Sequence, residues 1–476
     1  MEFKKGHILP TIRIQKIEIE NFKSVKHGEI LFNCGRKYVP QDTEADILGI
    51  YGQNGSGKTA VIEALAILDK ALEGTRIPSR YSECISTHAD FAKLSFTFDL
   101  QYPAEEPYIR TVIYSFKLEA IPNDPIDEPD DVIRISLLYP TKVRLFDEVI
   151  SAGGFFDGEH QKMQDIITTT GKTYPIGPVR KIPYYVGDKK EALKVDLSVN
   201  KVTASKESTS FIFKKETLEL FEQHSNYSEY YQVLSELHHF ASLYLYAVDT
   251  RTSGIGAVLN VPFNTRFGTL ALRLIDSSHV SLEIFEDLEY FVSSINTVLP
   301  TLVSGLTLEL VHDDYVRDGK KGKEVKLFSK RNDTLIPLRD ESAGIIKLVS
   351  VLSLVIATFN DRSLTVAIDE LDAGIYEYLL GEILAALETY GKGQFIFTSH
   401  NLRPLEVLKK ESIIFTTSNP DNRYIRLKGV GKTNNLRSLY LREIVGGSQD
   451  EEIYDAAKRQ RMITAFLKAG DGIVQE

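Results

Sequence analysis

Cysteine is nearly absent from this chain, since Cys34 and Cys84 are the only two among 476 residues. Two isolated cysteines provide neither a disulfide framework nor the ligand spacing of a metal site, which is typical of a protein that works in a reducing cytoplasm. We therefore expect both to be buried filler residues.

The chain also has little that suggests export, membrane insertion or a generally basic surface. Residues 1–10 contain no apolar stretch long enough for a signal peptide. The longest apolar run, 344–359, contains Lys347 and is too short to span a bilayer, so it predicts a buried helix. The formal net charge of -10 disfavours a protein that coats nucleic acid, although it leaves room for a local basic groove. We expect a cytoplasmic protein that makes no membrane contact.

The most specific motif is the run from Gly52 to Thr59, which fits the phosphate-loop pattern GxxxxGK[ST]. A predicted strand, 47–51, precedes it and a predicted helix, 60–73, follows it, as the pattern requires. Backbone N–H groups of such a loop surround phosphates, while Lys58 reaches the β- and γ-phosphates and Thr59 binds Mg²⁺. The sequence therefore predicts a site for ATP and Mg²⁺, with these nucleotide contacts: Gly52, Asn54, Gly55, Ser56, Gly57, Lys58 and Thr59.

Polar residues follow two further predicted strands, 364–368 and 394–399. Ligands of α/β folds bind at the carboxyl ends of parallel strands, where Asp369, Glu370 and His400 would lie. We expect Asp369 to bind Mg²⁺ and Glu370 to polarise the attacking water, because phosphoryl transfer depends on positioning and charge neutralisation. His400 would hydrogen-bond the γ-phosphate, and Asp372 would lie at a dimer seam.

The start of the long apolar helix suggests a contact between two copies of the chain. Ser342 and Gly344 open this helix, and a helix N-terminus can accept a phosphate. Because each copy already has its own phosphate loop, these residues would contact the partner's nucleotide and close an ATP sandwich across a dimer. The alternative is a plain N-cap.

The remaining pattern predicts four parts: an N-terminal ATPase lobe, 1–150; an inserted, mainly helical lobe, 151–300; a C-terminal ATPase lobe, 301–433; and a helical tail, 434–476. Alternation predicts two strands ahead of the phosphate loop, 12–20 and 28–32, and two after its helix, 94–100 and 108–118. The latter two would form an antiparallel layer beside the nucleotide sheet. The insert is expected to contain helices 214–248 and 281–299.

A lysine-rich segment follows the insert. Short predicted strands, 306–310 and 324–328, flank a predicted loop at 313–323, and basic residues recur from Lys320 to Arg331. A solvated hairpin is one interpretation, and a contact with DNA phosphates is the other.

In their order along the chain, these motifs resemble the ABC-type ATPase heads of the SMC, RecF and OLD families. Residues 17–24 look like the first strand and adenine-side turn of those heads, 342–347 like a reduced signature helix, 366–370 like Walker B and 372 like the D-loop aspartate. Gln101 is a candidate for the Q-loop glutamine. The reduced signature and the tail, 434–442 with Gly446 and Gly447, are similar to the ATPase subunits of PARIS-type bacterial anti-phage systems.

The resemblance implies an α/β fold with a mixed sheet, flanking helices, an antiparallel layer and a helical insert. It also implies an ATPase switch that forms homo-oligomers and controls a separate Toprim-type nuclease, with a phage protein as a trigger. Only 76 residues follow His400, so we do not expect a fused Toprim domain. Two alternatives remain: a RecF- or SMC-like clamp on DNA, and a nucleotide sensor that does not hydrolyse ATP.

Overall fold

The computed structural model describes residues 9–32, 45–103, 108–123, 139–156, 159–169, 190–223, 228–248, 260–265, 268–273, 278–317, 320–332, 334–428, 435–446, 450–453 and 459–471. All structural statements below concern these residues. Cys34, Asn434 and Gly447 lie outside them.

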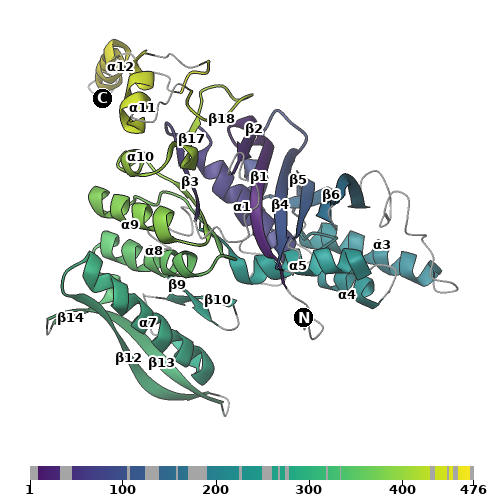
Figure 1. Cartoon of the computed structure of the whole chain (residues 1–476), viewed down its shortest axis with the longest axis horizontal. Helices are drawn as coiled ribbons and strands as arrows, with labels where there is room; N and C mark the ends of the chain where they lie inside the picture. The colour runs from purple at the N-terminus through teal and green to yellow at the C-terminus, as the bar shows by residue number, and fades with distance from the viewer. Residues whose placement is uncertain are drawn as a thin grey trace.

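A six-stranded core sheet carries the phosphate loop (Figure 1). Its strand order is β18-β17-β3-β16-β15-β8, and all neighbours are parallel except β18 and β17. The bounds are β3 Asp46–Tyr51, β8 Leu245–Val248, β15 Thr365–Ile368, β16 Gln394–Thr398, β17 Ile413–Thr416 and β18 Tyr424–Ile425. Strands β3, β15, β16 and β17 are buried at every position, as expected for a parallel sheet covered on both faces. The strands predicted at 47–51, 364–368 and 394–399 are therefore confirmed.

A second, antiparallel sheet lies beside the core sheet. Its order is β2-β1-β4-β5-β6-β7, with bounds β1 Thr11–Phe22, β2 Val25–Leu31, β4 Ala92–Tyr102, β5 Tyr108–Pro122, β6 Thr141–Phe156 and β7 Glu159–Thr168. In β1 the buried residues Ile12 and Ile14 precede a register shift, and Ile17 and Ile19 resume the buried face after it. The bulge keeps the apolar side chains on one face. The predicted antiparallel layer is confirmed.

Helix α1, Lys58–Leu72, joins the two sheets into one core. It belongs to a hydrophobic cluster that contains the buried face of the antiparallel sheet and, from the core sheet, Leu48, Ile50, Ala367, Ile396 and Ile414. Helices α3 Lys190–Glu207, α4 Lys215–Gln223 and α5 Ser228–Tyr244 contribute to the same cluster. The phosphate loop therefore begins a helix that is buried along almost its whole length.

Helices α8 Ala343–Asn360, α9 Glu377–Tyr390, α10 Pro404–Val407 and α11 Leu436–Gly446 cover the opposite side of the core sheet. Helix α7 Leu282–Leu302 and a small sheet pack against α8 (Figure 1), while helix α12 Arg459–Asp471 is exposed. The small sheet has the order β11-β13-β12 with β14 on β13, and its strands are β11 Ser278–Ser281, β12 Leu306–Arg317, β13 Lys320–Arg331 and β14 Thr334–Pro337. The further strands β9 Asn260–Thr265 and β10 Gly268–Arg273 form a hairpin. Short 3₁₀ turns are η1 Ser79–Cys84, η5 Leu338–Asp340 and η6 Lys410–Ser412.

The middle of the chain differs in detail from the sequence-based expectation. The predicted boundary at residue 150 falls inside β6, and the predicted helix 214–248 consists of α4, α5 and the core strand β8. The predicted loop at 313–323 is mostly paired strand, because β12 and β13 remain in register out to Arg317 and Lys320. The helical insert thus contributes a strand to the core sheet. The four-part division of the chain remains a prediction.

Helix α8 is apolar and packs into the core of the protein. Among the described helices it alone is long and apolar enough to cross a bilayer, with a mean hydropathy of 1.9 over 18 residues, so our expectation that no segment reaches that length was wrong. Half of it is buried, and its side chains enter two core clusters: Val351, Leu354 and Val355 pack with the core sheet, and Ile346, Leu348 and Leu352 pack with α7. The prediction of a buried helix is confirmed.

Candidate functional site

One cavity of about 570 Å³ lies where the phosphate loop meets the ends of β15 and β16. Its lining residues are Lys23, Ser24, Asn54, Gly55, Gly57, Lys58, Thr59, Ala60, Glu83, Asp369, Glu370 and His400. It brings together eight of the predicted site residues from three distant parts of the sequence. Gly52, Ser56, Ser342, Gly344 and Asp372 are not part of the lining.

The phosphate loop turns through two left-handed glycines before α1 begins. Gly55 has φ 77° and Gly57, the N-cap of α1, has φ 96°, a region that side chains other than glycine rarely adopt. The Lys58 ammonium donates hydrogen bonds to the carbonyls of Gly52 and Gln53, each at 2.9 Å. Burial lowers the pKa of Lys58, and the carboxylates of Asp369, Glu370 and Asp372 oppose this shift. These carboxylates favour the charged lysine in a mostly buried place.

Gly52 and Ser56 of the phosphate loop face β17 instead of the cavity. The Ser56 hydroxyl donates to the Gln53 carbonyl at 2.6 Å and hydrogen-bonds the Thr416 hydroxyl. A Cβ added to Gly52 would lie 1.7 Å from Thr416 Oγ1. These two residues shape the loop through packing on its far side.

The two acids that follow β15 share one buried hydroxyl. Thr398 Oγ1, in β16, donates to Asp369 Oδ1 at 2.5 Å and accepts the Glu370 N–H at 2.8 Å. Asp369 is fully buried, whereas Glu370 is exposed and has a left-handed backbone with φ 47°. Such a conformation costs a non-glycine residue on the order of 1–3 kcal/mol, which the hydrogen bond from Glu370 to Thr398 helps to offset.

Asp372 binds the loop after β16 instead of pointing away from the subunit. Its carboxylate accepts the N–H of His400 at 3.2 and 3.3 Å and the N–H of Asn401 at 3.1 Å. The side chain therefore fixes the segment that carries His400. If Asp372 lies at a dimer seam, as predicted from the sequence, it does so while accepting these hydrogen bonds within its own subunit.

The predicted signature helix begins with a normal N-cap. The Ser342 hydroxyl accepts the Ile345 N–H at 3.3 Å, which matches the plain N-cap alternative. Ser342 is exposed. Gly344 packs against the backbone of Gly374, where an added Cβ would lie 2.3 Å from the Gly374 carbonyl oxygen. The start of α8 and the turn after Asp372 therefore touch through two glycines.

Two lysines near the cavity were not predicted as functional from the sequence. Lys23, at a left-handed position of the turn between β1 and β2, forms an ion pair with Glu63 of α1, whose side chain is buried. Lys347 of α8 is buried, and burial lowers its pKa against the opposing effect of the acids after β15. The sequence signals were indirect: Lys23 falls in the segment 17–24 that resembles an adenine-side turn, and Lys347 interrupts an otherwise apolar helix. Gln101, the Q-loop candidate, lies in β4 and does not line the cavity.

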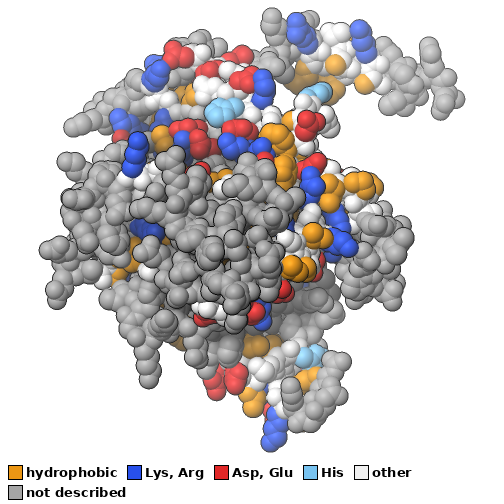
Figure 2. Space-filling model, turned by 90° about the vertical axis from the view of Figure 1, so that its right-hand side faces the viewer, with side chains coloured by type: hydrophobic (Ala, Val, Ile, Leu, Met, Phe, Trp, Pro, Cys, Tyr) orange, Lys and Arg blue, Asp and Glu red, His pale blue; other side chains and the backbone are white. Residues whose placement is uncertain are grey.

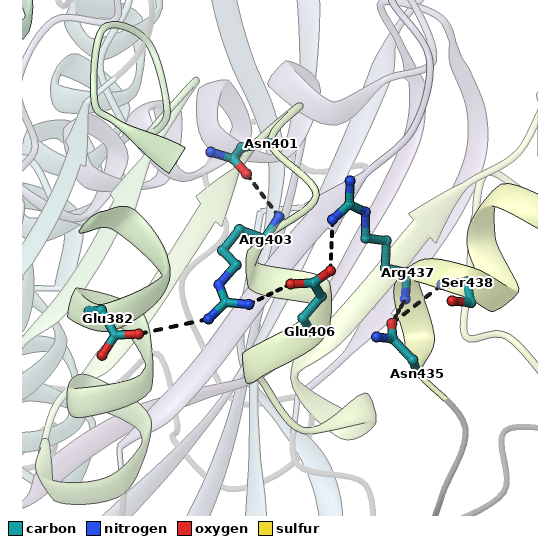
Figure 3. A network of polar contacts seen from close by, with 7 residues as sticks. All are labelled: Glu382, Asn401, Arg403, Glu406, Asn435, Arg437 and Ser438. Atoms are coloured by element: carbon teal, nitrogen blue, oxygen red, sulfur yellow. Dashed lines mark hydrogen bonds and ion pairs between the residues drawn. The ribbon is translucent and has the colours of Figure 1, made fainter. Parts of the chain in front are cut away.

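The segment that carries His400 is also tied to the C-terminal helix α11 (Figure 3). Glu406 accepts hydrogen bonds from Arg403 at 2.6 Å and from Arg437 at 2.7 Å. Its two arginine partners, Arg437 first, hold the pKa of Glu406 below its usual value. The Asn401 side chain accepts the Arg403 N–H at 2.8 Å. The network thus connects the His400 loop, α10 and α11.

The lysine-rich hairpin of β12 and β13 is only partly neutralised. Lys323 pairs with Asp314 at 2.6 Å and Lys330 with Glu309 at 2.7 Å, while Lys326 is exposed. On the face drawn in Figure 2, acidic and basic side chains are interspersed among the described residues. A phosphate contact by the hairpin remains a prediction.

Comparisons with known proteins come from one family and several solved structures. Residues 16–115 match a family model described as AAA domain. No curated protein matches the sequence significantly.

Solved structures similar to this chain include an SMC head bound to the C-terminal winged-helix domain of ScpA, with a TM-score of 0.38, 13% identity and coverage of 87% of this chain and 97% of that one. An SMC head domain with a coiled coil and joint from Pyrococcus yayanosii has a TM-score of 0.40 and 10% identity, covering 91% and 99%. RecF in its ATP complex has a TM-score of 0.34 and 13% identity, covering 83% and 94%. Because these TM-scores lie below 0.5, the proposals below rest on the residues of this chain.

Proposed function

We propose that this protein binds and hydrolyses ATP in the cavity described above. The observation that carries the proposal is the meeting of Lys58, Thr59, Asp369, Glu370 and His400 around one space. Phosphoryl transfer to water requires a phosphate loop with a lysine, a hydroxyl and a carboxylate that can hold a metal ion, and an acid that can activate water, and all of these groups line the cavity.

The residues present fit a Mg²⁺ ion. The Thr59 hydroxyl and the Asp369 carboxylate are the hard oxygen ligands that Mg²⁺ prefers alongside phosphates. Asp369 is fully buried and, like Thr59, lines the cavity, so both oxygen groups lie where a cation bound to phosphates would be held. When bound, the ion would neutralise phosphate charge in the transition state.

The chain's own residues would do the remaining work. Lys58 exchanges its hydrogen bonds to the Gly52 and Gln53 carbonyls for bonds to phosphate oxygens. Glu370 accepts a proton from the attacking water, and His400 donates a hydrogen bond to the γ-phosphate.

We further propose that two copies close an ATP sandwich and that larger homo-oligomers build on it. Ser342 and Ala343 are exposed, and neither lines the cavity of its own subunit. The exposed N-terminus of α8 is thus free to face the γ-phosphate bound by a partner copy. Its contact with Gly374 places it beside the turn that holds Asp372.

At the level of biology, we propose an anti-phage switch in which ATP state controls a separate Toprim-type nuclease and a phage protein is the trigger. The support is the resemblance in the signature helix and the tail. The tail is also linked to the nucleotide site, because Arg437 of α11 and Arg403 beside the His400 loop share Glu406 (Figure 3).

The second candidate is a DNA clamp of the RecF or SMC kind. The hairpin of β12 and β13 favours it, because exposed Lys326 and the neighbouring basic residues could contact phosphates. Binding of duplex DNA that weakens steeply with salt would support this candidate.

ATP binding and turnover test the central proposal. Lys58→Ala should lose most ATP binding. Glu370→Gln should keep binding and lower kcat by about 100-fold, within the range typical of lost general-base catalysis. Glu411→Gln, at an exposed position away from the cavity, is the matched control and should behave like the wild type. Normal ATP binding and hydrolysis by Lys58→Ala would refute the proposal.

The biological role needs partner identification. Tagged Glu370→Gln, isolated from its native host with ATP and Mg²⁺, should retain its partners in the ATP-bound state. Recovery of a Toprim-type nuclease by mass spectrometry would support the switch, whereas duplex DNA with repair proteins would favour the clamp.

A further inference from the structure

The hairpin of β17 and β18 contacts the back of the phosphate loop at several points. The hydroxyl of Tyr424 donates to the Gly57 carbonyl at 2.8 Å, and Thr416 contacts Ser56. Tyr424 is buried, and a Cβ on Gly28 would lie 2.4 Å from its ring, so Gly28 makes room for it.

The hydrogen bond to Gly57 bears directly on nucleotide binding. In a planar trans peptide the carbonyl and the following N–H point in opposite directions. Holding the Gly57 carbonyl from behind therefore turns the Lys58 N–H toward the cavity, where a phosphate oxygen would accept it. The Gly57 carbonyl also accepts the Ala60 N–H at 3.2 Å, so Tyr424 and the first turn of α1 fix this peptide together.

The preceding residue of the hairpin contacts a second part of the cavity lining. Arg423 is buried and donates hydrogen bonds to the carbonyls of Ser24 and Thr417. Ser24 lines the cavity. Two adjacent residues, Arg423 and Tyr424, thus position two separate parts of the lining.

A short C-terminal segment, 450–453, holds the turn of this hairpin. The Glu451 carboxylate accepts hydrogen bonds from Asn422 at 2.9 Å and from Asn419 at 3.1 Å. The Ser418 N–H donates to the Glu452 carbonyl at 2.7 Å. The turn is also bound to β2, because the Pro420 carbonyl accepts two N–H groups there.

We propose that the β17–β18 hairpin is a positioning element of the nucleotide site and that segment 450–453, through Glu451, regulates ATP affinity by setting the hairpin's place. This inference rests on the proposed function, because it assigns regulation to the same site. The C-terminal tail, which continues into the exposed helix α12, is then the part of the chain through which nucleotide affinity is adjusted.

ATP–Mg²⁺ titration calorimetry on the Glu370→Gln parent tests the proposal without turnover. Tyr424→Phe should raise the Kd for ATP about fivefold to tenfold, the equivalent of one net hydrogen bond. Glu451→Gln should raise it about threefold. The double variant should bind like Tyr424→Phe alone, because both changes act through one hairpin. If either substitution impairs folding, Asn422→Ala provides a second test, because it removes the same hydrogen bond to Glu451 from an exposed position.

The outcomes separate this inference from the proposed function. If the parent itself does not bind ATP, both are refuted. If the parent binds and Tyr424→Phe or Asn422→Ala binds equally well, the inference alone is refuted. A double variant whose Kd is the product of the two single effects refutes the link between tail and hairpin. A drop in the denaturation midpoint with unchanged Kd shows a merely structural role and also refutes it.

Discussion

Replacing Gly344 with alanine has two opposing effects on stability, a gain in helix propensity and a loss from a steric clash. Alanine is normally favoured over glycine inside a helix by about 1 kcal/mol, so propensity alone predicts a more stable protein. The structure predicts the opposite. The new Cβ would lie 2.3 Å from the backbone carbonyl oxygen of Gly374, about 1.1 Å closer than an ordinary contact near 3.4 Å. Backbone on both sides must move, because no side chain can rotate away.

We expect Gly344→Ala to lower the free energy of unfolding by roughly 1–3 kcal/mol, the usual cost of overpacking. Guanidinium denaturation of the full chain measures this change through the midpoint at constant slope. Gly305→Ala is the comparison variant, because Gly305 has φ 70° and an added Cβ would meet nothing within 4 Å, so it reports backbone strain without a clash. ATP turnover should also fall, since Gly374 belongs to the turn that begins with Asp372. A Gly344→Ala protein that is more stable than the wild type would refute the predicted close contact.

Two further predictions concern buried polar groups. Thr398→Val removes the hydrogen bonds to Asp369 and Glu370, so kcat should fall about tenfold and stability by about 1–3 kcal/mol; steady-state kinetics with a normal kcat would contradict this. Burial raises the pKa of Asp69 from 3.8 to about 7, despite the opposing effect of Lys70. The folded state therefore binds this proton more tightly than the unfolded state. As the pH rises from about 4 to about 7, the free energy of unfolding should fall, by at most about 4 kcal/mol. Urea denaturation of Asp69→Asn over this pH range should show a smaller fall in the free energy of unfolding than the wild type shows. An equal fall in both proteins would contradict the raised pKa of Asp69.

The site residues that could be predicted from the sequence are those that can be recognised from a short, contiguous stretch of residues. The phosphate loop is a contiguous motif, and Asp369 and His400 directly follow strands that are recognisable by their apolar runs. Thr398, Glu63 and Tyr424 could not be predicted in the same way, because their roles depend on contacts with residues far away along the chain, up to 367 positions for Tyr424 and Gly57.

The fold shows the same division. Alternating apolar residues predict the antiparallel strands, because one face of that sheet is buried along its length. Strand β8 was missed because its residues were assigned to the end of the predicted helix 214–248. Only the pairing with β15 identifies Leu245–Val248 as part of the core sheet. The hairpin of β12 and β13 was predicted too short because glycine and charge favour a loop, yet backbone pairing tolerates exposed charges.

The strand order of the core sheet has a consequence for synthesis on the ribosome. Strand β3 ends at Tyr51, but its two neighbours, β16 and β17, begin only at Gln394 and Ile413. During translation its apolar side chains and both of its backbone edges therefore lack their native partners until most of the chain has emerged. The nucleotide site is therefore completed late, and until then the unpaired edges of β3 are open to pairing with other molecules.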